Sequence, residues 1–369
     1  MKKFSTILQQ LVKCSIVFFC LAGCAHHTSQ IHESSAVITQ HHTLVQGLLQ
    51  QSVGEAENLV HAINQFRKQT NQTNLEQVKG AWSTAKNMYS LLEATRFSGH
   101  AIDEVDTLIN AWPIDEVYID YAGGQNRGII ATPDIEITGQ NLLHLNEQQG
   151  ETNISIGFHA IEFLLWGQDN NVNGPGNRPL TDFTSGPLAE RRKQYLFETA
   201  TLLLFHLDKL SNDWMNTTLN SSQLPDIITG LGTFIKAELV GERIQVALDT
   251  FDQEDEQSCF SDLTNQDIIQ NIKGVKSLLT GIPPTAKSQS THTSVGLIHL
   301  FSKQQSPLTD QMMSNINSSL QLMQSLNMSF DQAILPTNPE SRDKLTRVTE
   351  LMNDVANDLR TLQYQKYGQ

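Results

Sequence analysis

The chain has 369 residues, a formal net charge of −14 and a hydrophobic content of 39%. This length is sufficient for a large buried core divided between two domains. Nucleic acids and anionic lipids are excluded as expected partners because an acidic surface repels them, whereas cations are favoured.

The N-terminal 23 residues have the pattern of a targeting signal rather than of a folded domain. A basic leader precedes an apolar segment at 14–24, which is too short to span a membrane as a stable helix. The segment ends in LAGC, which resembles a bacterial lipobox, so we expect cleavage before Cys24 and acylation of this cysteine. Acyl chains would anchor the protein to a membrane surface. Ala25 favours the outer membrane, facing the periplasm or the cell surface.

The four cysteines predict no intramolecular disulfide. Cys14 and Cys20 leave with the leader and Cys24 would carry lipid, so Cys259 stands alone. The stability of the fold must therefore come from packing.

The rest of the sequence predicts helices and no sustained strand. Residues 24–37 are polar and without a pattern, as expected for a flexible tether. Beyond them, apolar residues recur at three- and four-residue spacing. These helical patterns cover residues 44–66, 75–97, 191–210, 227–239 and 342–363. A long loop rich in Gly, Pro and Asn indicates a domain boundary near Ser185. We expect an all-α protein with two helical-bundle domains, at 38–185 and 186–369.

A buried polar pair is predicted within the apolar segment 154–169. His159 and Glu162 lie three residues apart, and hence on one face of a helix that is apolar nearly all round. A buried carboxylate requires a cation, a network of donors or a proton. An imidazole with a carboxylate is half of a site for iron or zinc. Alternatively, the two side chains hydrogen-bond to each other or to neighbouring helices and bind nothing.

A zinc peptidase is a weaker interpretation of the same helix. The peptidase motifs H-E-x-x-H and H-x-x-E-H supply a second histidine, but position 163 is Phe. Peptide hydrolysis is not supported without that ligand.

Two acidic segments have alternative interpretations. The sequence D-x-N-x-N-G from Asp169 matches the opening of a calcium loop, but Leu180 stands where a bidentate glutamate is needed, so we interpret it as a turn-rich loop. Residues 249–262 contain acids with no Lys or Arg between them, which indicates a solvated face or a face stabilised by a cation or an arginine. These acids are Asp249, Asp252, Glu254, Asp255, Glu256 and Asp262.

Two further groups of polar residues could line a binding site, or could instead have a purely structural role. Glu238 and Glu242 lie four residues apart beside Arg243, and these side chains could line a site or pair with one another. Aromatic and acidic side chains that could form a pocket wall or a polar corner of the core are Trp112, Asp115, Glu116, Tyr118, Asp120 and Tyr121.

Taken together, segments 111–121, 154–169, 178–183 and 238–262 resemble the imelysin-like family, in its iron-regulated lipoprotein branch. The resemblance runs from about residue 40 to the C-terminus and is weakest from about Ser288. It implies two similar four-helix bundles, a functional site between them, and a G-x-H-x-x-E motif. Members were first classed as metallopeptidases, and a role in iron uptake is now favoured. The motif residues are Gly157, His159 and Glu162; the further cleft candidates are Glu93, Arg96, Trp112, Asp115, Glu116, Glu242 and Arg243.

From the residues and the resemblance we expect an envelope lipoprotein that binds iron, or zinc as a second choice, at His159 and Glu162 and takes part in iron uptake. It would capture or hand over the metal without turnover. Expected partners are a metal ion or an iron complex, the membrane through Cys24, and an envelope iron-transport protein. The alternatives are a zinc metallopeptidase, or a binding module for haem, a siderophore or a protein, with a recognition wall made by Trp112, Tyr118 and Trp166.

Overall fold

The computed structural model describes residues 2–125, 127–171, 174–284, 294–301 and 305–368, with side chains from His32 onward. Within these residues the protein is helical and has no strand, only an isolated bridge between Ala122 and Gln125. The prediction of an all-α fold is confirmed. The helices are α1 (Lys2–Lys68), α2 (Gln72–Leu92), η1 (Glu93–Thr95), α3 (Ala101–Ile109), α4 (Glu116–Ile119), α5 (Gly139–Leu145), α6 (Gly157–Trp166), α7 (Thr181–Thr184), α8 (Ala189–Asn216), η2 (Ser221–Gln223), α9 (Leu224–Thr233), η3 (Phe234–Gln245), α10 (Val246–Thr250), η4 (Gln253–Asp255), α11 (Thr264–Thr280), η5 (Leu297–Leu300), α12 (Ser306–Gln324), α13 (Phe330–Ile334) and α14 (Pro339–Tyr367).

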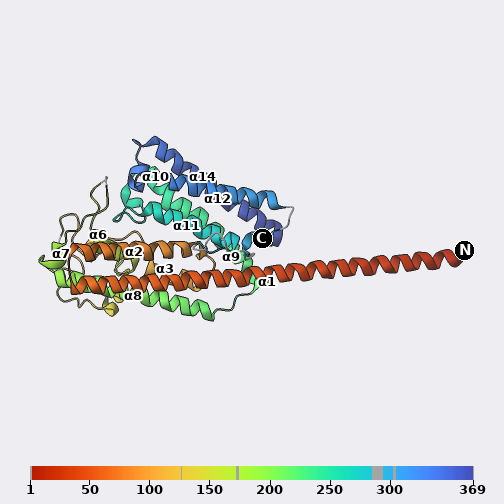
Figure 1. Cartoon of the computed structure of the whole chain (residues 1–369), viewed down its shortest axis with the longest axis horizontal. Coiled ribbons are helices and arrows are strands. Elements are labelled where there is room, and N and C mark those ends of the chain that lie inside the picture. The colour runs from red at the N-terminus through yellow and green to blue at the C-terminus, as the bar shows by residue number, and fades with distance from the viewer. Residues whose placement is uncertain (1, 126, 172–173, 285–293, 302–304, 369) are drawn as a thin grey trace.

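The first helical group consists of α1, α2, α3, α6 and α8. α1 packs along α2 and α8, while α6 lies against α2, α3 and α8 (Figure 1). These helices form because apolar residues at helical spacing give each one a buried stripe, such as Leu75, Val78, Trp82 and Tyr89 of α2. The amide oxygen of Asn71 caps α2 by accepting a hydrogen bond from the backbone N–H of Asn74 at 2.9 Å.

The second helical group consists of α9, η3, α10, α11, α12 and α14. α14 packs against α9, η3 and α12, and α11 packs against α12 (Figure 1). η3 is a π-helix that continues α9, and such wide turns occur often at functional sites. α11 ends at Gly281, which takes the left-handed conformation that favours glycine.

α8 belongs by its contacts to the first helical group. It packs against α1, α3, α6 and α7, although the boundary predicted near Ser185 placed it in the second domain. The boundary was predicted from the Gly- and Pro-rich loop, but this loop connects α6 to α7 and α8, and α6 and α8 belong to the same group. A division of the chain into two helical units is better placed after Asn216, where α8 ends.

α1 also differs from the sequence-based expectation. It is one continuous helix from Lys2 to Lys68, so residues 2–23 of the predicted leader and the predicted tether at 24–37 are helical. The prediction of a flexible tether is wrong for the end of this segment that adjoins the fold, because Val37 is 0% exposed. A packed helix propagates into adjoining polar sequence at little cost. Cys24 lies where no side chain is described, so its lipidation stays a prediction. Of the described helices, none combines the length and the apolar character needed to cross a membrane.

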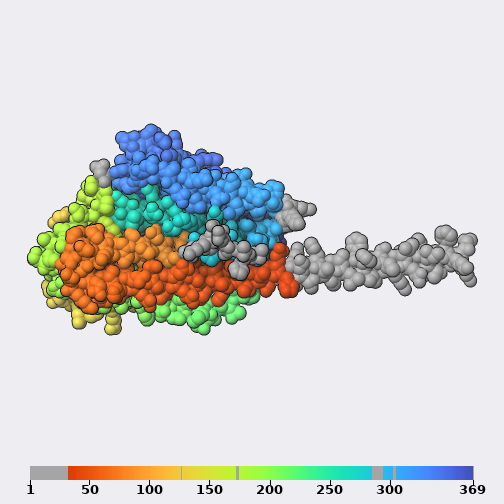
Figure 2. Space-filling model, in the orientation of Figure 1, coloured from red at the N-terminus to blue at the C-terminus, as the bar shows by residue number. Residues whose placement is uncertain are grey.

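The two helical groups meet where α11 packs against α2 and η1 and where α9 contacts η1. Figure 2 shows the teal surface of α11 next to the orange surface of α2. A Cβ atom on Gly274 of α11 would lie 2.3 Å from the carbonyl oxygen of Leu91, and one on Gly230 of α9 would lie 2.7 Å from that of Phe97. Only glycine permits these two backbone approaches. These two close contacts place η3, α11 and the segment before α11 against α2, α3 and α6.

Candidate functional site

The start of α6 is fixed by Gly157, the first residue of the G-x-H-x-x-E motif. Its φ of +88° is a conformation that favours glycine. A Cβ atom there would lie 2.8 Å from the carbonyl oxygen of Ile109, at the end of α3. Trp82 of α2 donates its indole N–H to the carbonyl oxygen of Phe158 at 3.0 Å. Every residue of α6 is buried, as its all-round apolar sequence predicts.

His159 and Glu162 form the predicted polar pair, and both are 0% exposed. The Nδ1 atom of His159 lies 2.9 Å from Oε2 of Glu162. The other carboxylate oxygen of Glu162 accepts hydrogen bonds from the backbone N–H and the hydroxyl of Ser261, at 3.0 and 2.6 Å. The Nε2 atom of His159 has no hydrogen-bond partner among the described residues. The pair therefore leaves one imidazole nitrogen available for a ligand.

Burial dominates the electrostatics of this pair. Desolvation raises the pKa of Glu162 to about 8, although the Ser261 hydroxyl opposes the rise. Desolvation also lowers the pKa of His159 well below its usual value, and the nearby charge of Lys86 lowers it further. His159 is therefore neutral at physiological pH. With this pKa Glu162 is largely protonated at neutral pH, so a metal that binds Nε2 of His159 would release one proton. Glu162 is then ionised, Nδ1 of His159 carries the ring proton, and the lone pair is on Nε2, which is the form that ligates metals.

A second ion pair links α2 to α11 beside this site. Lys86 and Asp267 are each 1% exposed, and Nζ of Lys86 lies 3.3 Å from Oδ1 of Asp267. Ser90 donates its hydroxyl proton to the same oxygen at 3.0 Å, and Ser258 donates to Oδ2 at 2.6 Å. The buried charges of Lys86 and Asp267 are thus paired and hydrogen-bonded, as charges away from water must be.

A third buried ion pair joins η1 to η3. The guanidinium of Arg243 donates to the two carboxylate oxygens of Glu93 at 2.5 and 3.0 Å. Glu93 also accepts hydrogen bonds from the amides of Asn110 and Asn271, at 2.8 and 2.9 Å. Although burial alone raises the pKa of Glu93, the charges of Arg243 and Lys86 hold it well below its usual range. Glu93 is therefore an anion that joins four elements of the fold.

Arg96 extends the polar network toward solvent. Its guanidinium pairs with Asp106 of α3 and with Glu238 of η3, each at 3.0 Å. Tyr89 donates its hydroxyl proton to Asp106 at 2.7 Å. Arg243 also reaches Glu238 at 3.0 Å. Arg96 and Arg243 therefore share one carboxylate at the edge of the network.

A cavity of about 480 Å³ lies where the polar network meets solvent. Four of the predicted cleft residues line it, namely Arg96, Trp112, Glu242 and Arg243. Glu93 lies directly behind Arg243, through the ion pair just described. Additional carboxylates in the lining are Asp106, Glu147, Glu151 and Glu238. Sequence reasoning thus selected residues that the fold brings together at one cavity.

The remaining candidates lie elsewhere. Asp115 caps α4 by accepting a hydrogen bond from the N–H of Val117 at 3.0 Å. Glu116 accepts one from the amide of Gln168 at 2.6 Å, and burial raises the pKa of Glu116 to about 7. Neither is among the residues that line the cavity.

The suggested aromatic wall is not formed. Trp112 lines the cavity, but Trp166 is 6% exposed and packs against the ring of Trp82 at a centroid distance of 5.2 Å. Tyr118 donates its hydroxyl proton to the carbonyl oxygen of Leu145 at 2.7 Å. The interpretation that these three rings form one recognition surface is therefore wrong.

Sequence reasoning missed the partners that come from α2, α11 and the segment before α11. Ser258 and Ser261 carried no signal, because their role depends on a contact distant in sequence. Asp267 and Asn271 carried a weak one, since with Thr264 they form a polar stripe at three- and four-residue spacing, and the other buried positions of this helix are largely apolar. Such a stripe indicates a polar layer within a core.

The donor set at the motif was tested against the requirements of a metal. In the described part of the chain, no three His, Cys, Asp or Glu side chains are grouped so as to hold a metal ion. His159 supplies one free nitrogen, and both oxygens of Glu162 already have partners. Structural zinc sites have four protein ligands and catalytic ones have three. His159 and Glu162 therefore fit a partial ligand set and not a complete protein-built one.

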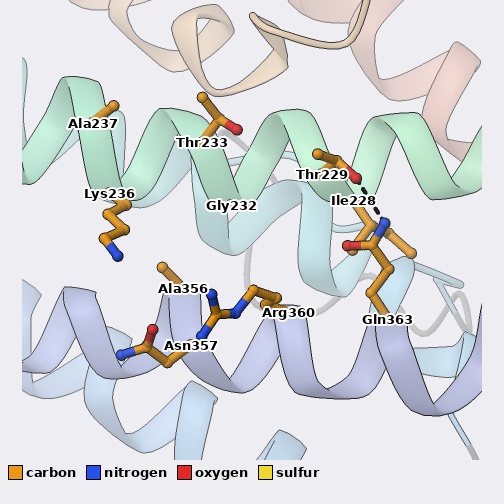
Figure 3. A pocket seen from close by; sticks show the side chains of 10 residues that line it. All are labelled: Ile228, Thr229, Gly232, Thr233, Lys236, Ala237, Ala356, Asn357, Arg360 and Gln363. Carbon is orange, nitrogen blue, oxygen red and sulfur yellow. Dashed lines mark hydrogen bonds between the residues drawn. The ribbon is translucent and has the colours of Figure 1, made fainter. Parts of the chain in front are cut away.

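Another cavity, of about 440 Å³, lies between α14 on one side and α9 and η3 on the other, and contains none of the predicted residues (Figure 3). Lys236 and Arg360 project into it from facing helices, and Gln363 donates an amide proton to the hydroxyl of Thr229 at 2.6 Å (Figure 3). No acidic side chain is among its lining residues. This cavity is thus unsuited to a cation.

The fold and the site define an all-helical protein with a buried polar network between two groups of helices. A family model described as Imelysin matches residues 44–362, and the chain belongs to this family. The resemblance noted in the sequence is thereby confirmed, and it extends through the C-terminal third.

Two solved structures have a similar fold. One is an iron-regulated protein A precursor from Parabacteroides distasonis, with a TM-score of 0.68, 15% identity, and coverage of 91% of this chain and 95% of that chain. The other is an imelysin-like protein from Psychrobacter arcticum, with a TM-score of 0.58, 13% identity, and coverage of 86% and 95%. At these identities the likeness concerns the fold alone. No curated protein matches the chain.

Proposed function

We propose that this imelysin-family protein is an envelope lipoprotein that binds iron, or another metal, between its two helical groups and takes part in iron uptake. The observation that carries the proposal is the Nε2 atom of His159. It is buried and lacks a hydrogen-bond partner among the described residues, while Nδ1 is held by Glu162. A carboxylate that is hydrogen-bonded to one imidazole nitrogen orients the other nitrogen toward a metal.

The partial ligand set determines the form in which the metal is bound. His159 and Glu162 provide two protein ligands at most, whereas iron sites in proteins commonly use three or more. Water or a chelating molecule would supply the remaining ligands. The protein would accordingly bind iron as a complex, in keeping with capture and release rather than permanent storage.

The cavity beside the network supports a cationic ligand. Its lining includes the carboxylates of Glu147, Glu151, Glu238 and Glu242. Carboxylates that line a concave surface raise the local concentration of cations. The net charge of −14 acts in the same direction.

Two observations outside the site support the cellular role. The leader ends in the lipobox-like LAGC, which directs a protein to the envelope with lipid on Cys24. The structural neighbour from Parabacteroides is described as an iron-regulated protein. A lipid-anchored metal-binding protein would deliver its ligand to a transport protein of the same envelope.

The test is the metal content of the full chain, purified without an affinity tag. The double variant His159→Ala/Glu162→Ala is compared with His61→Ala/Glu57→Ala, a matched His and Glu pair on the exposed face of α1. We expect close to one equivalent of iron or zinc in the wild type and the surface variant, and none in the motif variant. Absence of metal from all three after loading with ferrous and ferric iron would overturn the proposal.

A further inference from the structure

A second acidic cavity, of about 350 Å³, lies beside the loop that follows α6. It is lined by Asp169 of that loop, by Asp252 and Glu254 from the region of η4, and by Asp331 of α13. No basic side chain is among its lining residues. The cavity thus collects carboxylates from three segments that are far apart in sequence, and none of them belongs to the His159 site.

Two of these carboxylates are buried and incompletely satisfied. Asp331 is 3% exposed, and neither of its oxygens has a hydrogen-bond partner in the described part of the chain. Asp169 is 5% exposed; Oδ1 accepts the N–H of Asn171 at 2.9 Å, but Oδ2 has no partner there. Native proteins rarely leave buried polar atoms unpaired, because the loss of water is then uncompensated.

Glu256 and Asp262 add negative charge to the same region. Glu256 is 1% exposed, so the interpretation of this acidic stretch as a solvated face is wrong for Glu256. Burial raises the pKa of Glu256 well above its usual value, and the charge of Asp331 adds to the rise, with the hydroxyl of Thr264 opposing it. Burial and the charges of Asp331 and Asp169 likewise raise the pKa of Asp262 to about 7. These carboxylates are therefore close enough to repel one another electrostatically.

Arg342 lies beside the cavity but interacts with other groups. The guanidinium of Arg342 stacks over the ring of Phe251, which lines the cavity, at 4.6 Å. Its Nη1 donates to the carbonyl oxygen of Ile334 and its Nη2 to that of Leu248. Arg342 thus caps backbone carbonyls and does not neutralise the carboxylates.

The backbone segments that carry these acids are held in place independently of any ion. Gln253 donates an amide proton to the carbonyl oxygen of Asp169 at 2.6 Å. The N–H of Gly176 donates to the carbonyl oxygen of Phe260 at 2.9 Å. These bonds join the loop after α6 to the segment before α11, so the backbone around the cavity is held in place.

We propose that this cavity binds a divalent calcium ion through Asp169 and Asp331, with Glu254 and Glu256 in support. Ligands that are all oxygen favour a hard cation, and Ca²⁺ accepts six to eight oxygens in flexible geometry, water included. The described carboxylates are not already grouped in threes around one point. The ion therefore enters with bound water and draws the carboxylates inward. Mg²⁺ requires near-ideal octahedral geometry and is the poorer fit.

Sequence spacing could not reveal this arrangement. The stretch from Asp169 opens like a calcium loop but lacks its final glutamate, and Asn173 of that stretch lies outside the described residues. In the structure, the oxygens that complete the set come from α13 and from the acidic segment before α11. The site is therefore composite, and it links the first helical group to the second.

The test is calorimetric titration of the chelator-stripped full chain with CaCl₂, together with thermal unfolding at each concentration. We expect a saturable one-site heat and a midpoint that rises with Ca²⁺, because a ligand that binds only the folded state stabilises it. Asp331→Asn and, separately, Asp169→Asn keep the side-chain shape and are expected to weaken Ca²⁺ binding at least tenfold. Without calcium, Asp331→Asn is expected to unfold at a temperature equal to or above that of the wild type, because a repulsive charge is gone.

The matched control is Glu57→Gln on the exposed face of α1, which removes the same charge at a distant place. It is expected to bind Ca²⁺ like the wild type, and so is His159→Ala, which separates this site from the proposed iron site. No saturable heat up to 10 mM CaCl₂ in the wild type would overturn the proposal. Equal weakening in Glu57→Gln and Asp331→Asn would overturn it as well, because binding would then follow the overall charge.

Discussion

Glu93→Gln is expected to destabilise the protein because it removes the charge at the centre of the polar network. Glu93 is 0% exposed and accepts hydrogen bonds from Arg243, Asn110 and Asn271. Breaking a buried ion pair on one side leaves an uncompensated charge and costs about 3–5 kcal/mol. Arg243 retains Glu238 and the side-chain oxygen of Asn271, so we place the loss near the lower end, at about 3 kcal/mol.

The pH dependence of this loss provides a second criterion. Burial raises the pKa of Glu93, but the charges of Arg243 and Lys86 outweigh burial and hold it well below the usual range. A carboxyl with a depressed folded-state pKa contributes stability above its unfolded-state pKa, about 4.3, and this is lost as the pH falls toward the folded-state pKa. The difference between the wild type and Glu93→Gln is therefore expected to shrink below about pH 4.3.

The assay is urea unfolding followed by circular dichroism between pH 3 and pH 7. Glu350→Gln serves as the control, since Glu350 pairs with Arg347 at 2.7 Å while both side chains are 56% exposed. Removing such a surface pair changes stability by about 0–1 kcal/mol. A loss below about 1 kcal/mol for Glu93→Gln at pH 7, or a difference that stays constant down to pH 3, would refute the reasoning.

Two further predictions concern the G-x-H-x-x-E motif. Burial raises the pKa of Glu162 to about 8, above an unfolded value of about 4.3, so the wild type loses stability as the pH rises between the two values. Glu162→Gln removes that ionisation and is expected to gain on the order of 3 kcal/mol relative to the wild type between pH 5 and pH 8 in urea unfolding; a constant difference would contradict this. Gly157→Ala is expected to lose about 1–3 kcal/mol, because its Cβ would lie 2.8 Å from the carbonyl oxygen of Ile109. Gly54→Ala on α1, where a Cβ meets nothing within 4 Å, is the comparison for thermal unfolding, and equal midpoints would count against the clash.

The helical character of the fold was accessible from sequence because it rests on local periodicity. α2, α8 and α14 each repeat apolar residues at helical spacing, and their burial follows that pattern. The assignment of α8 to the first helical group could not be predicted from sequence. A loop rich in Gly and Pro indicates a turn, but it does not indicate which helices the following helix packs against. The helical start of the chain was missed because polar sequence can continue a helix that is packed elsewhere.

The candidate site was predictable in part. The burial of His159 and Glu162 follows from the apolar sequence around them, and the sequence candidates Arg96, Trp112 and Arg243 line the cavity. Their partners were not predictable, because the contacts of Glu162 with Ser261 and of Lys86 with Asp267 span 99 and 181 positions, respectively. Only the fold brings such residues together.

The two glycine contacts between the helical groups constrain how the protein can open. The two groups approach closely at Gly230 against Phe97 and Ser98 and at Gly274 against Leu91, where neither glycine has a side chain that could be compressed or reoriented. Two fixed points define a line, and the rigid-body motion that preserves both is rotation about that line. Sliding of one group along the other would break at least one contact. Any ligand that enters between the two groups is therefore expected to require a hinge-like opening about this axis or local movement of the surrounding loops, and a shear mechanism is disfavoured.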